Sequence, residues 1–356
     1  MKRAPLIVLL AAVLAGALGL AYIHHSDKNS PQDEVELSPL GTGAPGAPSS
    51  GGPAIQQEQL ALVRQLPAGA SAVVFADVSQ IRASAFAKEL AELAQSSEQD
   101  PQYTAFVRAT GFDYSRDLDR AAMALWPRTA PTSVVALAEG RFDRKRIANY
   151  AMQQGRVVRD NGREVYEFPE QGSNRIIRIA FLAPNRLALA DGPGLVAVLK
   201  SAETNRLDPT MSERVAQVAG TAFFSAARTE NLAQDIGLDE SKSPQLAHML
   251  KSVRSITLAG QPEADNLNIS ANAICDSALD ALQLMTVLDG LRWMGRAALA
   301  DPKLQQQMGP QWRPLDELLK AASLSRSGRT LRLRVQLTEQ MLAVDAGPAT
   351  GSTPAH

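Results

Sequence analysis

The chain is poor in the residues that build disulfide frameworks and metal centres. Cys275 is the one cysteine among 356 residues, so an intrachain disulfide framework is excluded. Three of the four histidines, His24, His25 and His356, stand near the ends of the sequence. A zinc site made of histidine and cysteine therefore lacks ligands, and we expect no metal and no cofactor.

An excess of charge of either sign is also missing. The 36 lysines and arginines face 37 aspartates and glutamates, which gives a formal net charge of -1. A chain without overall positive charge has no general attraction for a phosphate backbone, so no nucleic-acid partner is expected. Hydrophobic residues make up 45% of the chain and charged residues 21%, a composition that suits a globular body with a sizeable core.

The first 25 residues are predicted to be a membrane anchor or a signal segment. Lys2 and Arg3 precede an uncharged, largely apolar run over residues 4–23. As a helix, this run would span about 30 Å, the thickness of the hydrocarbon core of a bilayer. The basic flank is expected to stay in the cytoplasm, which places the body on the periplasmic or extracytoplasmic side of the inner membrane, behind a single pass. The Gly-Leu-Ala sequence at residues 19–21 offers a cleavage site as the alternative, but the length of the apolar run favours a retained anchor.

A linker is predicted to separate this segment from the body. Residues 26–57 include a stretch at 38–54 made almost entirely of glycine, proline, serine and alanine. Such a composition buries too little apolar surface to offset its ordering entropy, so we expect a disordered linker. The tail at residues 347–356 has a similar composition and the same prediction.

The regular pattern between residues 58 and 346 predicts an α+β body. Short apolar or alternating runs indicate strands, and a wider apolar period indicates helices, one of them capped by Asp143. The predicted strands cover residues 71–78, 121–126, 133–139, 164–168, 176–182, 186–190, 255–261, 268–273 and 329–337. The predicted helices cover residues 84–95, 143–154, 194–202 and 276–300.

Two divergent structural repeats are predicted within this body, over residues 58–205 and 206–346. Residues 68–77 resemble residues 219–228, and each segment contains a predicted strand. Because many strands follow one another directly, we expect antiparallel or mixed sheets with helices packed on one face. A doubly wound α/β sheet is the alternative, although several links are too short for a parallel crossover.

Motifs of catalysis are hard to find in the chain. The glycines at 41, 43 and 46 match a dinucleotide-binding pattern, but they stand in the predicted linker and not between a strand and a helix. His248 is the one histidine in the body, and no G-x-S-x-G sequence presents a nucleophilic serine beside it. Cys275 stands among apolar residues and is expected to be a buried small side chain. We therefore predict no catalytic residue.

An acidic stretch offers the one alternative with chemistry. Asp113, Asp117 and Asp119 stand close together before a predicted strand, and Arg116 and Arg120 would neutralise much of their charge. The spacing lacks the glycine and the distal glutamate of a calcium-binding loop, so a solvated turn is favoured over a cation site. A carboxylate- or metal-dependent hydrolase is kept as the second functional hypothesis.

Two basic features are candidates for binding an anion or a partner. One surrounds the start of the helix predicted at 143–154 and consists of Arg141, Arg144, Lys145 and Arg146. The other is the candidate binding patch of the last predicted strand, formed by Arg329, Arg332 and Arg334. Because Arg332 and Arg334 alternate with leucines, they should share one face of the sheet. A solvated sheet face is the plainer interpretation of this pattern.

Residues 66–78 (LPAGASAVVFADV), 112–113 (FD) and 138–143 (AEGRFD) resemble a loose group of uncharacterised bacterial proteins that are anchored in the membrane. The resemblance extends over residues 66–202 and matches no catalytic residue. It implies an envelope location and no activity. Together with the anchor, it favours a non-enzymatic module that binds an envelope protein or a lipid, with a structural subunit of a larger complex as a third possibility.

Overall fold

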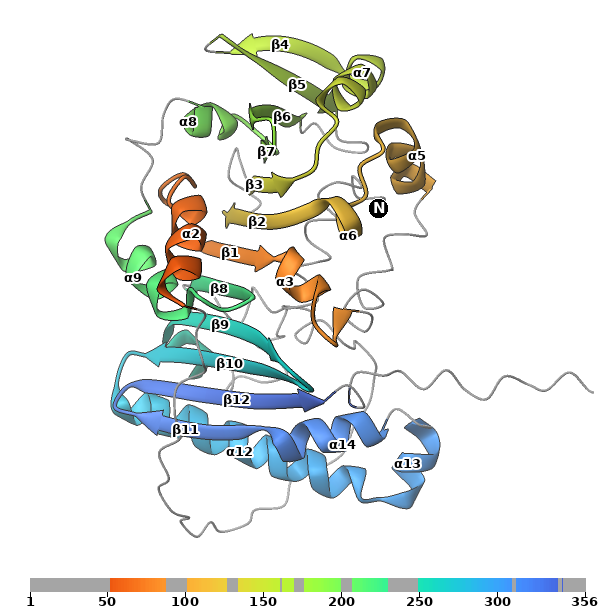
Figure 1. Cartoon of the computed structure of the whole chain (residues 1–356). Coiled ribbons are helices and arrows are strands. Elements are labelled where there is room, and N and C mark those ends of the chain that lie inside the picture. Colours follow the sequence, from red (N-terminus) through yellow and green to blue (C-terminus); the bar gives the residue numbers. More distant parts are fainter. Residues whose placement is uncertain are drawn as a thin grey trace, which may run out of the picture.

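The computed structural model describes residues 52–87, 101–126, 134–160, 162–169, 176–199, 207–229, 249–308, 312–338 and 341. Their centre is one 12-stranded antiparallel sheet with open edges (Figure 1). In spatial order its strands are β11 (Ser323–Ser327), β12 (Thr330–Thr338), β10 (Asn266–Cys275), β9 (Val253–Glu263), β8 (Phe223–Arg228), β1 (Ala72–Asp77), β2 (Leu118–Leu125), β3 (Val134–Gly140), β7 (Arg186–Ala190), β6 (Ile176–Ala183), β5 (Arg163–Pro169) and β4 (Arg156–Asp160). The α+β prediction is confirmed, and a doubly wound parallel sheet is excluded for these strands.

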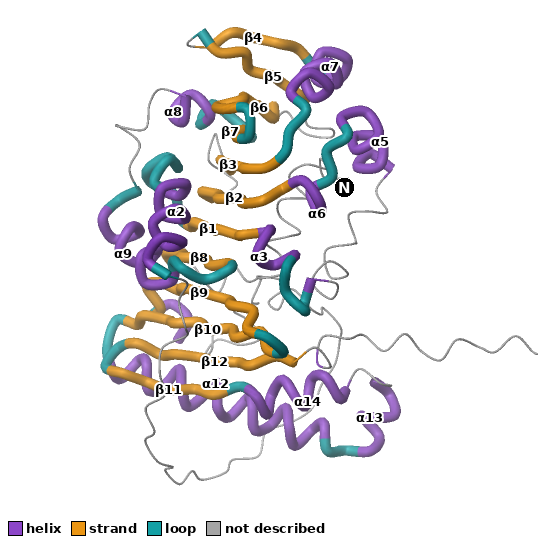
Figure 2. The backbone as a smooth tube through the Cα atoms, viewed as in Figure 1, coloured by secondary structure: helices purple, strands orange, loops and turns teal. Residues whose placement is uncertain are grey.

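Ten helices of the described residues accompany the sheet. They are α2 (Pro53–Val63), α3 (Val78–Arg82), α5 (Pro101–Thr110), α6 (Tyr114–Asp117), α7 (Arg144–Gln154), α8 (Leu195–Leu199), α9 (Pro209–Val218), α12 (Ala278–Leu299), α13 (Pro302–Met308) and α14 (Trp312–Ala321). Figure 2 shows α2, α8 and α9 on one side of the stacked strands and α5 and α7 on the other. No helix within the described ranges has both the length and the apolar character needed to span a bilayer.

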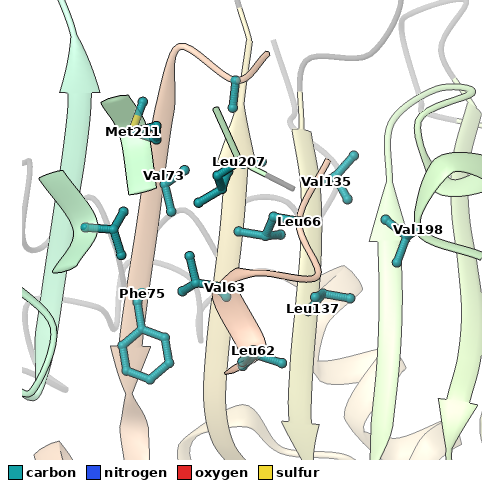
Figure 3. Packing of buried hydrophobic residues seen from close by; sticks show 14 of the residues in the cluster. Leu62, Val63, Leu66, Val73, Phe75, Val135, Leu137, Val198, Leu207 and Met211 are labelled. Carbon is teal, nitrogen blue, oxygen red and sulfur yellow. The ribbon is translucent and has the colours of Figure 1, made fainter. Parts of the chain in front are cut away.

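Helices cover both faces of the sheet, so the expectation of helices on one face was wrong. Strand β1 shows the reason, because its four central residues are all buried. Val73 and Phe75 pack in the cluster beneath α2, α8 and α9, which Figure 3 shows from close by. Val74 and Ala76 point the other way and pack in a second cluster with aromatic residues that precede and begin α6. A strand with two apolar faces requires cover on both.

The centre of the sheet pairs strands that are far apart in the sequence. Strands β1 and β8 are neighbours although almost 150 residues separate them, and they pair antiparallel in register around Val74 and Ser225. The rings of Phe75 and Phe224 stack across this pair with centroids 5.0 Å apart. Gln59 of α2 adds a buried bridge, because it accepts from the Gly220 N–H at 2.7 Å and donates to the Thr221 carbonyl at 3.0 Å.

Most predicted elements of the body are confirmed within a residue or two. The strands β1, β3, β5, β6, β7, β9, β10 and β12 and the helices α7 and α12 stand where the pattern predicted them, and β2 begins three residues earlier than predicted. Asp143 caps α7 by accepting from the Arg146 N–H. The sequence pattern did not predict β4, although the sequence Asn-Gly, which is typical of a hairpin turn, follows it at residues 161–162. It also did not predict β11 and the helices α2, α3, α5, α6, α9, α13 and α14.

The body begins earlier than predicted. Helix α2 starts at Pro53, so residues 53–57 are helical and do not belong to the linker. The predicted anchor or signal segment at 1–25, the remaining linker at 26–51 and the tail at 347–356 lie outside the described residues. Most of the helix predicted at 84–95 and His248 itself lie outside them too.

Candidate functional site

An open pocket of about 520 Å³ lies where β2 begins and β3 ends. Its volume lies in the range of small-ligand sites. Three segments that are far apart in sequence line it, at residues 110–117, 140–146 and 184–185. Because β2 and β3 are antiparallel partners, the residues before β2 and the residues after β3 reach the same edge of the sheet.

Asp117 is a buried charge in the lining of this pocket. Arg116 holds both of its carboxylate oxygens, with Nε–Oδ1 3.0 Å and Nη2–Oδ2 2.7 Å. Arg141 approaches from after β3, with Nε 3.4 Å from Oδ1. The backbone N–H of Asp113 also donates to Oδ2. The hydrogen bond from Arg116 is the main cause that lowers the pKa of Asp117 from 3.8 to about 2, against the opposing effect of burial.

Gly140 lets the two segments approach closely enough to form this arrangement. A Cβ at this position would lie 2.2 Å from the Asp117 carbonyl oxygen. The neighbouring Arg141 N–H donates to that same carbonyl at 2.8 Å. A side chain at residue 140 would therefore separate Arg141 from Asp117.

Arg146, in the first turn of α7, contributes another cation. Its Nη2 donates to the Arg108 carbonyl at 3.1 Å, and its guanidinium lies where a Cβ of Gly111 would be. Gly111 has a φ of 74°, which a glycine adopts without strain. Within the described part of the chain, Arg146 makes no ion pair, and its side chain is exposed. Its remaining donors face the pocket and the solvent.

An aromatic pair supports the lining. Phe112 and Phe142 stack with centroids 5.1 Å apart, and each lies within one of the two segments that carry the arginines. The lining therefore combines three guanidinium groups, two carboxylates and an apolar wall. This set holds one excess positive charge and suits a ligand that carries an anionic group next to an apolar one.

The acidic stretch is not the loop that the sequence predicted. Residues 114–117 form the short helix α6 and Asp119 lies in β2, so the three carboxylates are spread over two elements. Asp113 caps α6 by accepting from Ser115, and Asp119 pairs with Arg82 at 3.3 Å. Arg120 does not neutralise this group, because it pairs with Glu139 and Glu58. No group of three potential ligands able to hold a metal occurs among the described residues.

The candidate binding patch lies on β12, next to the β11 edge of the sheet, whereas the pocket lies at β2 and β3 near the middle. Arg332 and Arg334 share a face of β12, as predicted, and register pairs them with Asn272 and Ser270 of β10. Arg332 is exposed and donates from Nε to the Asn272 Oδ1 at 2.7 Å. Burial, and then the adjacent Arg332, lower the pKa of Arg334. Arg329 is exposed in the turn before β12.

The sequence pattern indicated Arg141, Arg146 and Asp117 as members of separate features and did not predict that they line one pocket. Arg116 was considered only as a neutralising charge, and Phe112, Phe142, Gly111 and Gly140 were not considered as parts of a site. The signal for their convergence is the antiparallel pairing of β2 with β3, which no local pattern reveals. Cys275 is fully buried, which confirms the expectation of a buried small side chain, and it packs in a small apolar cluster.

Comparison with known proteins reveals a remote structural likeness. No protein-family model matches the chain, and no curated protein sequence matches it. Solved structures of TP0453 resemble it: crystal form III has a TM-score of 0.45 and 11% identity, covering 79% of this chain and 95% of TP0453. Crystal form IV has a TM-score of 0.45 and 10% identity, with 81% and 97% covered. At this distance no residue role is carried over.

Proposed function

We propose that the chain is a membrane-anchored, extracytoplasmic binding module that recognises an acidic group of an envelope protein in the pocket beside α7. The observation that carries the proposal is Arg146, an exposed guanidinium without an ion pair in the described chain, next to Arg141 on a concave surface. A guanidinium fork binds a carboxylate or a phosphate through two parallel hydrogen bonds.

The internal carboxylate explains how the site keeps its shape before a ligand arrives. Asp117 forms ion pairs with Arg116 and Arg141, which hold both guanidinium groups at the pocket. An arginine that is already positioned loses less side-chain entropy on binding. The apolar wall of Phe112 and Phe142 fits a residue next to the acidic group of the partner. This arrangement supports recognition and presents no paired nucleophile and base.

The proposal includes the anchor at residues 1–25 and a duplicated body. The 20-residue uncharged run behind two basic residues supports the anchor and its orientation. The strand order supports two repeats. From the central pair outward, one half of the sheet has the order β1, β2, β3, β7, β6, and the other half has the order β8, β9, β10, β12, β11. In each half, the first three strands follow one another in the chain and the last two are in reversed chain order. In this correspondence β9 matches β2 and not β3, and the pair β4–β5 is an extension of the first repeat.

The test is a cross-linked pull-down of the tagged full-length chain from detergent-solubilised native membranes, read by mass spectrometry. We expect a near-stoichiometric envelope protein that decreases at least tenfold with Arg146→Glu. Arg159→Glu is the matched control, because it places the same charge change on the exposed face of β4 and should leave recovery unchanged. Equal recovery with both variants would contradict the pocket.

The patch of Arg329, Arg332 and Arg334 is the competing surface in the same experiment. A loss of the partner with the double change Arg329→Glu and Arg332→Glu, together with full recovery with Arg146→Glu, would move the binding surface to β12. Recovery of nothing above a control that carries the anchor alone would refute a stable protein partner. Phospholipid headgroups would then be the anions to test.

A further inference from the structure

Helix α12 carries an exposed, uncharged stripe along most of its 22 residues. Its four large members are Leu279, Leu282, Trp293 and Met294, which are 62%, 40%, 66% and 53% exposed. At 100° per residue they lie within about 60° of one line on the helix surface. Between them, the same line passes only uncharged residues, namely Gln283, Thr286, Gly290 and Ala297. An isolated exposed leucine is ordinary, but a continuous stripe with a tryptophan indicates an interaction surface.

The opposite side of α12 is occupied, so the stripe is turned away from the body. Leu284 and Ala281 are buried in a cluster with residues of β9, β10 and β12. Gly295 faces α14, where a Cβ would lie 3.1 Å from Leu319. Figure 1 shows α12 along the β11 end of the sheet, beside α14 and far from the proposed anion pocket near α5 and α7. The stripe is therefore independent of that pocket.

We propose that the occupant of this stripe is the same stripe of a second copy of the chain, with the two α12 helices antiparallel around a two-fold axis near residue 288. The large residues stand toward the two ends of the stripe, and small ones stand near its middle. A two-fold axis at the middle of a helix brings each position against one equally far on the other side.

Size complementarity along the stripe supports this arrangement. The axis places Leu282 of one copy against Trp293 of the other, on the same flank of the interface. It places Thr286 against Gly290, where a Cβ meets nothing within 4 Å in the single chain. Thr286 already donates its hydroxyl to the Leu282 carbonyl at 2.9 Å, so this hydroxyl needs no partner across the interface. Close approach of two helices is easiest where the facing residues are small.

The charges of α12 leave the contact undisturbed. Asp289 stands at the border of the stripe, and Arg292 of the same helix neutralises it at 2.7 Å. The four large side chains would bury on the order of several hundred Å² in the pair, less than the roughly 1,200–2,000 Å² of a stable interface. The dimer is therefore weak in solution. A common membrane anchor would raise the local concentration and favour the pairing.

Site-directed cross-linking tests the geometry. Cys275→Ala first removes the native thiol, which is buried. Two differently tagged full-length copies are then expressed together, one with Leu279→Cys and the other with Ala297→Cys, and native membranes are treated with a short thiol cross-linker. These positions face each other in the antiparallel pair. The control combines two copies with Leu279→Cys, which the pair separates by about 27 Å.

The expected result is a cross-linked dimer between Leu279→Cys and Ala297→Cys. Its yield should be at least tenfold higher than the yield of the dimer between two Leu279→Cys copies. Leu282→Glu should abolish the 279–297 cross-link, whereas Met152→Glu, at an exposed apolar position on α7, should not. Circular dichroism of both variants checks that the exposed substitutions leave the fold intact. A dominant 279–279 product indicates parallel helices and overturns the proposal, as does the absence of any product.

A lipid surface is the alternative occupant of the stripe, and the fluorescence of Trp293 can detect it. With Trp126 and Trp312 changed to phenylalanine, Trp293 is the one remaining tryptophan. Quenching of its fluorescence by brominated phosphatidylcholine in vesicles that hold the full-length chain, without the 279–297 cross-link, would assign the stripe to the membrane and overturn self-association. Fluorescence that is insensitive to the brominated lipid, together with the cross-link, supports the dimer.

Discussion

Replacing Asp117 by asparagine should destabilise the protein by about 2 kcal/mol at neutral pH. The carboxylate is buried and held by Arg116 and Arg141, and its pKa is about 2 instead of 3.8. A pKa shift of one unit corresponds to about 1.4 kcal/mol, so the ionised form contributes about 2 kcal/mol when the unfolded carboxyl is also ionised. Asparagine keeps the shape of the side chain and removes the charge.

The effect should depend on pH in a defined direction. Because the folded pKa is depressed, the contribution is complete above pH 4 to 5 and is lost as the pH falls toward 2. Asp117→Asn and the wild type should therefore converge in acid. With these pKa values, the difference between them should decrease by about half between pH 7 and pH 3.

The assay is urea unfolding of the full-length chain in detergent micelles, followed by circular dichroism at both pH values. Asp143→Asn is the matched control, because asparagine caps a helix as well as aspartate does and α7 should keep its N-terminus. A difference for Asp117→Asn below 0.5 kcal/mol at pH 7, or one that does not shrink at pH 3, would refute the role of the arginines in holding this carboxylate.

Three further predictions concern the core and the pocket. Phe75→Ala should cost about 3–5 kcal/mol in urea unfolding, because the ring is fully buried and stacks on Phe224, whereas Phe75→Leu should cost less than half as much. Gln59→Leu should cost about 2–4 kcal/mol by the same assay, because it leaves the Gly220 N–H and a neighbouring carbonyl buried without partners, and a cost under 1 kcal/mol would contradict this. Inorganic phosphate should raise the thermal midpoint of the wild type and not that of Arg146→Ala, and equal shifts would exclude Arg146 from anion binding.

Residues in local patterns account for most of what sequence reasoning predicted correctly. The alternation of Leu331, Leu333, Val335 and Leu337 identified β12 and the face that it buries, because neighbouring side chains of a strand point to opposite sides. The cap at Asp143 identified the start of α7 through a bond three residues away. Each of these signals acts over a few residues and is visible in the chain itself.

The convergence of the pocket needed contacts that no local pattern carries. Asp117 and Arg141 are brought together by the pairing of β2 with β3, and Gly140 allows the approach. The sequence analysis placed the same residues in a turn and at a helix start, and it paired Arg120 with the wrong carboxylates. Ion pairs between distant segments follow the sheet order, which is fixed by burial over the whole body and not by the spacing of charges.

The sequence by itself determined the class of the fold, the boundaries of about half of the described elements, the balanced charge and the absence of an intrachain disulfide. The tertiary structure decided the order of the 12 strands, the cover on both faces and the exposure of the α12 stripe. The physical reason is one of range. Propensities, caps and alternation act between residues a few positions apart, whereas the joining of β1 to β8 and the burial of each face depend on segments that meet only when the whole chain folds.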